Sequence, residues 1–113
     1  DAMRGAGMPE GESILGNIKS GIKVILEGGV AKMPDRSSFA GSVALADRLV
    51  RTMIKMGEVP LIDAIKMITA TPARIMKLND KIGSLKKGMD ADILVFNQEI
   101  EMQSIIIKGN QIK

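Results

Sequence analysis

The 113-residue sequence contains neither histidine nor cysteine, and these two absences narrow the chemistry open to it. Without histidine the chain lacks the commonest general base and the commonest metal ligand. Without cysteine it has no thiol nucleophile and no disulfide, which fits a reducing compartment and leads us to expect a cytoplasmic location. Carboxylates, lysines, arginines and hydroxyl groups are the side chains left for chemistry.

Aromatic residues are scarce, since the chain has two Phe and no Trp or Tyr. The composition is 45% hydrophobic and 26% charged, which is typical of a globular domain. Aromatic side chains supply much of the buried area in small independent cores. Their scarcity suggests that part of the aliphatic surface packs against a partner or against the rest of a longer chain.

The net charge is +3 and the pI is near 9.3, but the 16 basic residues are scattered. Lys86 and Lys87 form the one adjacent pair, and few aromatic rings are available to stack on bases, so we expect no nucleic-acid partner. No apolar run approaches the roughly 20 residues that span a bilayer, so we expect no membrane segment. The sequence begins with Asp1 rather than Met, for which an internal start is the simplest explanation.

The first 42 residues predict two loops, residues 1–12 and 33–42, around strands and turns that include a β-hairpin. Residues 22–26 begin by alternating and are rich in β-branched residues, which favours a strand. Residues 27–29 contain Gly28 and Gly29 and predict a turn, after which residues 30–32 return as the second arm.

Helical spacing follows. Apolar residues recur at three- and four-residue intervals, which predicts an amphipathic helix with Ser42 as N-terminal cap and Gly57 at its C-terminal end: Ala46, Leu49, Val50, Met53 and Ile54. A second helix, residues 60–70, has a wide apolar sector and is expected to be largely buried. Thr71 and Pro72 predict the start of a short third helix over residues 73–76.

The remaining residues predict strands after a polar loop. Residues 93–96 are continuously apolar, which is typical of a strand covered on both faces. Residues 104–107 predict another strand, and Gly109-Asn110 predicts the turn to a return arm. The strands at the two ends of this α+β chain could pair into one sheet, or they could be the closing third of something larger.

Three segments of the sequence carry motifs. The first comprises Asp1-Ala2-Met3, residues 6–11 and Leu15-Gly16, and the second is Phe39-Ala40-Gly41-Ser42. The third is Thr71-Pro72-Ala73-Arg74 with residues 83–95. Read together, these segments resemble the C-terminal part of N-acetylglucosamine-6-phosphate deacetylases, which belong to the amidohydrolase superfamily. The third segment recurs across many amidohydrolases. The chain would be roughly the last third of such a protein.

This resemblance implies a fold and a domain division. The family fold is a (β/α)8 barrel beside a small β-sandwich built from both ends of the chain. Residues 1–78 would be the end of the barrel domain, with an inserted hairpin near residues 22–32, and residues 79–113 would be strands returning to the sandwich. Active sites of this fold lie at the C-terminal ends of the barrel strands, where the resemblance puts Asp1.

The resemblance also implies a reaction, the hydrolysis of N-acetylglucosamine 6-phosphate to glucosamine 6-phosphate and acetate. Asp1 matches the family's proton-transferring carboxylate. The family's metal ligands, a Glu and two His that hold a divalent metal such as zinc or iron, lie in earlier segments. We therefore expect no metal on this chain alone and no activity from it.

Phe39, Ala40, Gly41 and Ser42 match a family loop that lies against the sugar, although the residues alone also fit an ordinary loop before a helix. Three arginines are possible phosphate ligands that we do not favour: Arg4, Arg36 and Arg74. Asp90 and Asp92 are interpreted as a turn and strand entry rather than a catalytic pair.

Two alternatives stay open. The generic third segment fits another amidohydrolase equally well, such as a cyclic-amide hydrolase or a deaminase. The strand–helix–strand order also fits a non-enzymatic α+β interaction module. In the family reading we expect a homo-oligomer that binds an amino-sugar phosphate, and we expect the isolated chain to self-associate through its apolar helix and edge strands.

Overall fold

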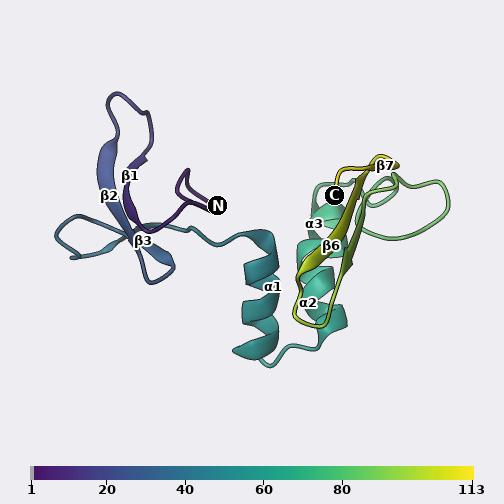
Figure 1. The fold of residues 1–113 in the computed structure, drawn as a ribbon. Coiled ribbons are helices and arrows are strands. Elements are labelled where there is room, and N and C mark those ends of the chain that lie inside the picture. Colours follow the sequence, from purple (N-terminus) through teal and green to yellow (C-terminus); the bar gives the residue numbers. More distant parts are fainter. Residues whose placement is uncertain (1) are drawn as a thin grey trace. The chain divides into compact units, whose positions relative to one another are not determined.

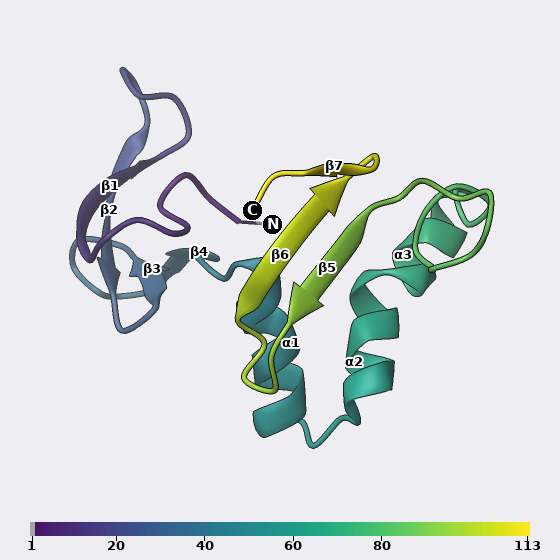
Figure 2. The ribbon, with the colours of Figure 1, turned by 45° about the vertical axis from the view of Figure 1, so that its right-hand side comes forward.

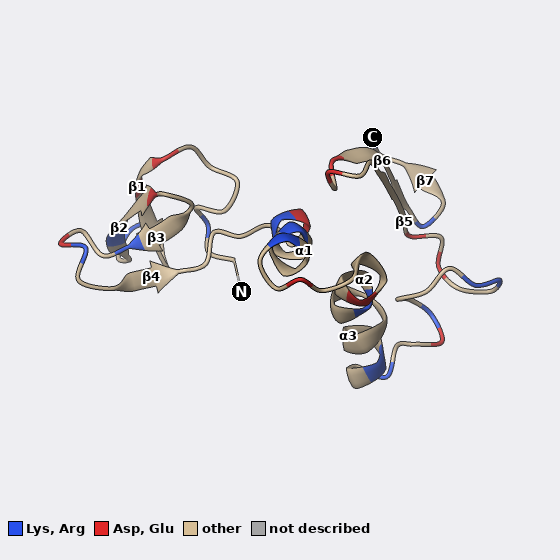
Figure 3. Ribbon diagram, turned by 90° about the horizontal axis from the view of Figure 1, so that it is seen from below, with Lys and Arg blue, Asp and Glu red and all other residues tan. Residues whose placement is uncertain are grey.

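The computed structural model describes residues 2–113, and the backbone divides between Leu45 and Ala46 into two compact units. The first unit carries strands and loops, and the second carries three helices followed by strands (Figure 1). The mixed α+β class expected from the sequence is confirmed. Lysine and arginine as well as aspartate and glutamate are scattered over both units (Figure 3).

The first unit is a four-stranded antiparallel sheet whose strands follow one another in sequence order (Figure 2). Its strands are β1 (Gly11–Leu15), β2 (Ile22–Glu27), β3 (Val30–Lys32) and β4 (Phe39–Gly41). The predicted hairpin is β2–β3, and both turn residues, Gly28 and Gly29, have positive φ angles of 59° and 73°. Two positive φ angles define the turn that best suits two-residue hairpins, which is why glycine occupies both positions.

The buried face of this sheet is small. Val24 and Leu26 lie two residues apart on β2, and Leu26 pairs with the buried Ala31 of β3. Gly5, from the loop before β1, packs on Leu26 so closely that a Cβ there would lie 2.8 Å from the leucine methyl carbons. The loop after Met3 is thereby held against the sheet.

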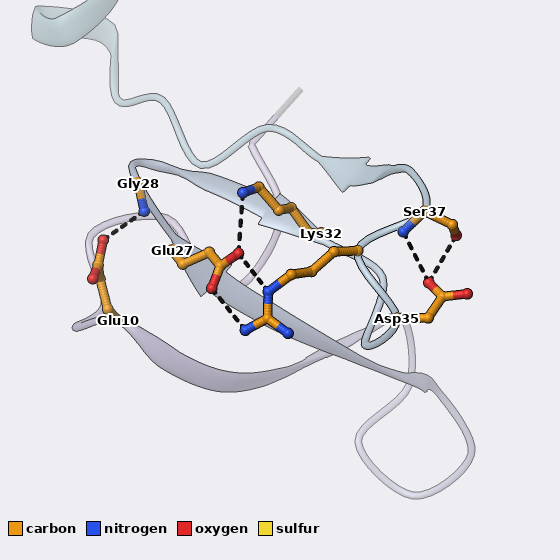
Figure 4. Close-up of polar contacts among 7 residues, drawn as sticks. Glu10, Glu27, Gly28, Lys32, Asp35 and Ser37 are labelled. Carbon is orange, nitrogen blue, oxygen red and sulfur yellow. Dashed lines mark hydrogen bonds and ion pairs between the residues drawn. The ribbon is translucent and has the colours of Figure 1, made fainter.

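Charged side chains fasten the hairpin to the loop of residues 33–38 that leads to β4 (Figure 4). Glu27 accepts hydrogen bonds from Arg36 Nε at 2.9 Å, Arg36 Nη2 at 3.0 Å and Lys32 Nζ at 3.0 Å. The hydrogen bonds from Arg36 and then Lys32 lower the pKa of Glu27 from 4.5 to about 2. Asp35 accepts hydrogen bonds from the amide and hydroxyl of Ser37, which lower its pKa as well.

The first predicted helix is confirmed as α1 (Ala46–Lys55). Gly57 closes its end by donating to the Thr52 carbonyl at 3.3 Å, but the positive φ expected there belongs to Glu58, at 53°. Glycine is needed at position 57 because a Cβ would lie 2.9 Å from the Met53 carbonyl oxygen. The prediction that Ser42 caps this helix is wrong, since α1 begins four residues later.

The second and third helices are α2 (Leu61–Ile68) and α3 (Ala70–Ile75). The prediction that Thr71 caps a helix beginning at residue 73 is wrong, because α3 already begins at Ala70. Pro72 is the third helical residue, where its missing N–H would have had no helical acceptor. Thr69 lies between the helices and donates its hydroxyl to the Ile65 carbonyl at 2.7 Å.

A separate antiparallel sheet follows, built from β5 (Ile93–Phe96), β6 (Met102–Ile107) and β7 (Asn110–Gln111). In the described residues the strands of the two ends therefore form two sheets rather than one. The final turn is one residue earlier than predicted. Lys108 and Gly109, with φ angles of 49° and 80°, make the turn, and Asn110 pairs with Ile107.

The core of the second unit joins its helices to the β5–β6 loop through Val50, Ala64 and Ile100. Ile100 has a φ of 60°, a conformation that β-branched residues rarely adopt. The Asn97 side chain holds this loop by accepting from the amides of Glu99 and Glu101, both at 3.0 Å. Arg51 of α1 donates to the Ile100 carbonyl at 3.0 Å, so the strained residue is fixed from both sides.

The prediction that α2 is largely buried is wrong for this structure, where Ala64 is its one fully buried residue and Ile62 is 65% exposed. β5 was predicted to be covered on both faces, yet Leu94 and Val95 are about half exposed. Both predictions assumed a second layer of packing, which the described residues do not supply over these faces. Large exposed apolar surfaces mark contact sites.

We predict that Ile100→Ala lowers the free energy of unfolding of the 113-residue chain by about 2–4 kcal/mol, the usual cost of truncating a buried isoleucine. Ile107→Ala is the matched control, because that side chain is 49% exposed and Ile100 is 4% exposed. Urea unfolding monitored by circular dichroism measures both. Equal losses for the two variants would contradict the assignment of Ile100 to the core.

We predict that Glu27 titrates with a midpoint near pH 2. Its folded pKa is depressed, so the stabilisation is complete above about pH 4.5 and is lost as the pH falls through 2. The NMR shift of its carboxyl carbon reports the midpoint. Arg36→Gln should raise the midpoint toward 4.5, whereas Lys23→Gln, the same charge change elsewhere on β2, should leave it in place. A wild-type midpoint near 4.5 would show that the ion pairs do not form.

We predict that the isolated chain self-associates at micromolar concentration through the apolar face of α2, since Leu61, Ile62 and Met67 are each at least 48% exposed. Ile62→Glu should lower the mass measured by light scattering, and Gln98→Glu, an exposed polar position with the same added charge, should not. A monomeric wild type that binds no hydrophobic dye would overturn this expectation.

Candidate functional site

The structure brings together residues from the two segments that resemble the sugar-phosphate deacetylases most specifically. Ala2 and Ser42, forty positions apart, form a parallel β-bridge, and the Met3 amide donates to the Ser42 carbonyl at 2.9 Å. Asp1, the predicted catalytic carboxylate, lies outside the described residues. Its covalent neighbour Ala2 is therefore paired with the last residue of the predicted substrate loop.

The predicted substrate residues Phe39, Ala40 and Gly41 form β4, and Ser42 follows directly. Phe39 is 76% exposed, so its ring is open to a ligand. The Ser42 hydroxyl accepts a hydrogen bond from the Ala44 amide at 3.2 Å, and a hydroxyl that accepts can still donate its proton. An exposed aromatic ring and a hydroxyl donor suit the apolar face and the oxygens of a sugar.

Gly41 has a φ of +154°. Residues with side chains rarely adopt this conformation, which explains glycine at this position. A Cβ here would lie 3.5 Å from Met3 Sδ and 3.7 Å from Met3 Cβ, which is ordinary van der Waals contact. Met3 and Gly41 therefore pack side by side where the two segments meet.

Met3 was missed by the sequence reasoning as a partner of Ser42. Its contact is made by a backbone amide, and backbone amides carry no side-chain signal. The loop that follows is closed by its own turns, in which Ala6 donates to the Met3 carbonyl at 2.9 Å and Met8 to the Gly5 carbonyl at 3.1 Å. These turns contain residues 6–8, the first part of the 6–11 segment that resembles the family.

The described residues do not form a divalent-metal site by themselves. The sequence has no histidine, and within residues 2–113 no three acidic, cysteine or histidine side chains gather closely enough to hold an ion. Metal sites of hydrolases need at least three such ligands. Any metal used by a longer protein would need ligands from other segments.

The arginines considered as phosphate ligands differ in their surroundings. Arg36 makes a two-point ion pair with Glu27, so much of its charge is already neutralised. Arg4 and Arg74 are exposed. None of these contacts supports a phosphate site.

Asp90 and Asp92 have structural partners. Asp92 accepts from the Lys108 amide at 2.8 Å, and the Asp90 amide donates to the Lys81 carbonyl at 2.8 Å. Both residues lie just before β5, which agrees with their interpretation as a strand entry. Among the described residues no helix is long and apolar enough to cross a bilayer.

Comparison with known proteins supports the resemblance. The N-acetylgalactosamine-6-phosphate deacetylase of Escherichia coli O157:H7 is 35% identical over 96% of this chain and 28% of its own length. The N-acetylglucosamine-6-phosphate deacetylase of Lysinibacillus sphaericus is 33% identical over 96% of this chain and 27% of its own length. This chain thus spans little more than a quarter of either relative.

The fold is shared as well. The crystal structure of N-acetylglucosamine-6-phosphate deacetylase from Pasteurella multocida matches 98% of this chain and 28% of that protein, with a TM-score of 0.87 at 19% identity. A cyclic-amide hydrolase, a deaminase or a non-enzymatic module is not favoured by these similarities. The model of the amidohydrolase family matches residues 13–112. The chain therefore belongs to the amidohydrolase family.

Proposed function

We propose that this chain is the C-terminal part of a longer deacetylase that removes the acetyl group from an N-acetylated hexosamine 6-phosphate. The observation that carries the proposal is the pairing of Ala2 with Ser42, because it joins the segment of the catalytic candidate to the sugar-loop candidate in one place. The names of the relatives and the family membership support the same reaction.

In this proposal Asp1 takes a proton from the attacking water and delivers it to the departing nitrogen, so that water and amide become acetate and amine. Phe39 to Ser42 line the sugar, with the ring against its apolar face and the Ser42 hydroxyl donating to an oxygen. A divalent metal, zinc or iron, would lower the pKa of the water and polarise the amide carbonyl. Its ligands would come from the preceding part of the longer protein.

Two epimers of the sugar are candidates for the substrate. The sequence alone resembles the glucosamine enzymes, whereas the relative at 35% identity is named for the galactosamine epimer. The epimers differ at one hydroxyl, and a site that hydrogen-bonds a particular hydroxyl rejects the other isomer strongly. We propose N-acetylglucosamine 6-phosphate as the substrate and its galactose epimer as the competitor.

The wider arrangement is also proposed. Residues 1–78 would end a (β/α)8 barrel that contains the inserted hairpin, and residues 79–113 would return to a small β-sandwich. We propose a cytoplasmic homo-oligomer as the working form. The exposed faces of α2 and β5 are the surfaces that barrel and sandwich neighbours would cover.

We predict that the longer protein, supplied with metal, releases acetate from one of the two sugar phosphates and that Asp1→Asn lowers kcat at least about 100-fold. Enzymatic detection of acetate measures both. Asp90→Asn is the matched control and should retain activity, since Asp90 lies before β5 and its backbone amide bonds the Lys81 carbonyl. The 113-residue chain alone should release none. A metal-loaded wild type that deacetylates neither epimer would overturn the proposed function.

A further inference from the structure

The contact between the two candidate segments is made by main-chain atoms. The Met3 amide reaches the Ser42 carbonyl at 2.9 Å, and the residue before that carbonyl is Gly41, with its φ of +154°. A change in this φ moves the chain that follows Gly41, and with it the Ser42 carbonyl that accepts from the Met3 amide. The conformation of Gly41 therefore sets where the strand segment containing Ala2 and Met3 meets the loop.

We propose that Gly41 is a positioning residue, which acts through the Ser42 carbonyl to hold Ala2 and Met3, the residues that follow Asp1 in the chain, at a fixed register against the substrate loop. The inference rests on the proposed function. It explains what aligns the catalytic carboxylate with the substrate. Proton transfer depends steeply on such alignment, and a misplacement of about 1 Å costs on the order of 100-fold in rate.

The effect of a side chain at position 41 would be conformational rather than steric. The nearest atom to an added Cβ would be Met3 Sδ at 3.5 Å, which leaves normal room. The φ of +154° is the obstacle, because a residue with a Cβ relaxes toward negative φ. That relaxation moves the Ser42 carbonyl away from the Met3 amide.

Gly11 is a matched control in the same sheet. Its φ is +137°, close to that of Gly41, and an added Cβ would meet nothing within 4 Å. It is the first residue of β1 and pairs with Leu26. Gly11→Ala thus carries a similar backbone cost without touching the contact between Met3 and Ser42.

The experiment compares Gly41→Ala with Gly11→Ala in the metal-loaded longer protein, by kinetics across pH and by hydrogen exchange of peptides covering residues 1–8. We expect Gly41→Ala to lower kcat about 100-fold, to shift the acidic limb of the kcat–pH profile and to speed exchange at Met3. Gly11→Ala should leave all three within about twofold. A rise in KM alone, with kcat and exchange unchanged, would reduce Gly41 to a local loop residue and overturn the inference.

Hydrogen exchange separates this inference from the proposed function. If the wild type releases no acetate, the proposed function fails, while faster Met3 exchange in Gly41→Ala and not in Gly11→Ala still supports the coupling. If Gly41→Ala does not fold, hydrogen exchange of the Met3 amide in the wild type is the deciding measurement. A Met3 amide that exchanges as fast as an unstructured one in the wild type would overturn the inference.

Discussion

The first unit depends on one contact between its two ends, the hydrogen bond from the Met3 amide to the Ser42 carbonyl. The chain leaves Met3, forms the sheet and returns to Met3 at Ser42. One backbone hydrogen bond contributes only about 1 kcal/mol net, too little to join segments so far apart in sequence. The antiparallel order of β1 to β4 does most of this work, because each strand is placed by its predecessor. Gly5 against Leu26 and the ion pairs of Glu27 hold the two ends of that path to the sheet.

In the second unit a single side chain, that of Ile100, joins segments that are distant in the sequence. The helices and the sheet of this unit meet through few fully buried residues, so Ile100 has to enter the core from a loop. Its positive φ costs conformational energy, which the Asn97 hydrogen bonds and the Arg51 contact offset. Strain of this kind persists only where neighbouring contacts fix the backbone.

The sequence predicted the features whose cause is local. Gly28-Gly29 and the alternation of β2 identify a hairpin because turn geometry and strand period act over a few residues. The apolar spacing of α1 identifies a helix for the same reason. The start of α3 was predicted wrongly because a proline is acceptable anywhere in the first helical turn. Pro72 therefore does not identify the residue at which the helix begins.

Burial was predicted less well because it depends on what covers a face. The apolar sector of α2 and the residues of β5 are correctly placed on a helix and a strand, yet they remain exposed in this chain. The pairing of Met3 with Ser42 was also beyond the sequence. It joins distant residues through atoms that every residue except proline carries. Resemblance alone identified both segments, and the structure adds that they touch.

The charges of the described residues limit what this part of the molecule contributes to catalysis. Arg36 lies in the loop leading to Phe39 and would be the obvious counter-ion for a sugar phosphate, but Glu27 holds it at two points. Releasing it would leave Glu27 with Lys32 alone, and the Arg36 hydrogen bonds are the largest cause of the low pKa of Glu27. In the proposed enzyme Arg36 would therefore not be the group that neutralises the phosphate. This chain would contribute a proton-transferring carboxylate and a sugar-facing loop, joined through Met3 and Ser42.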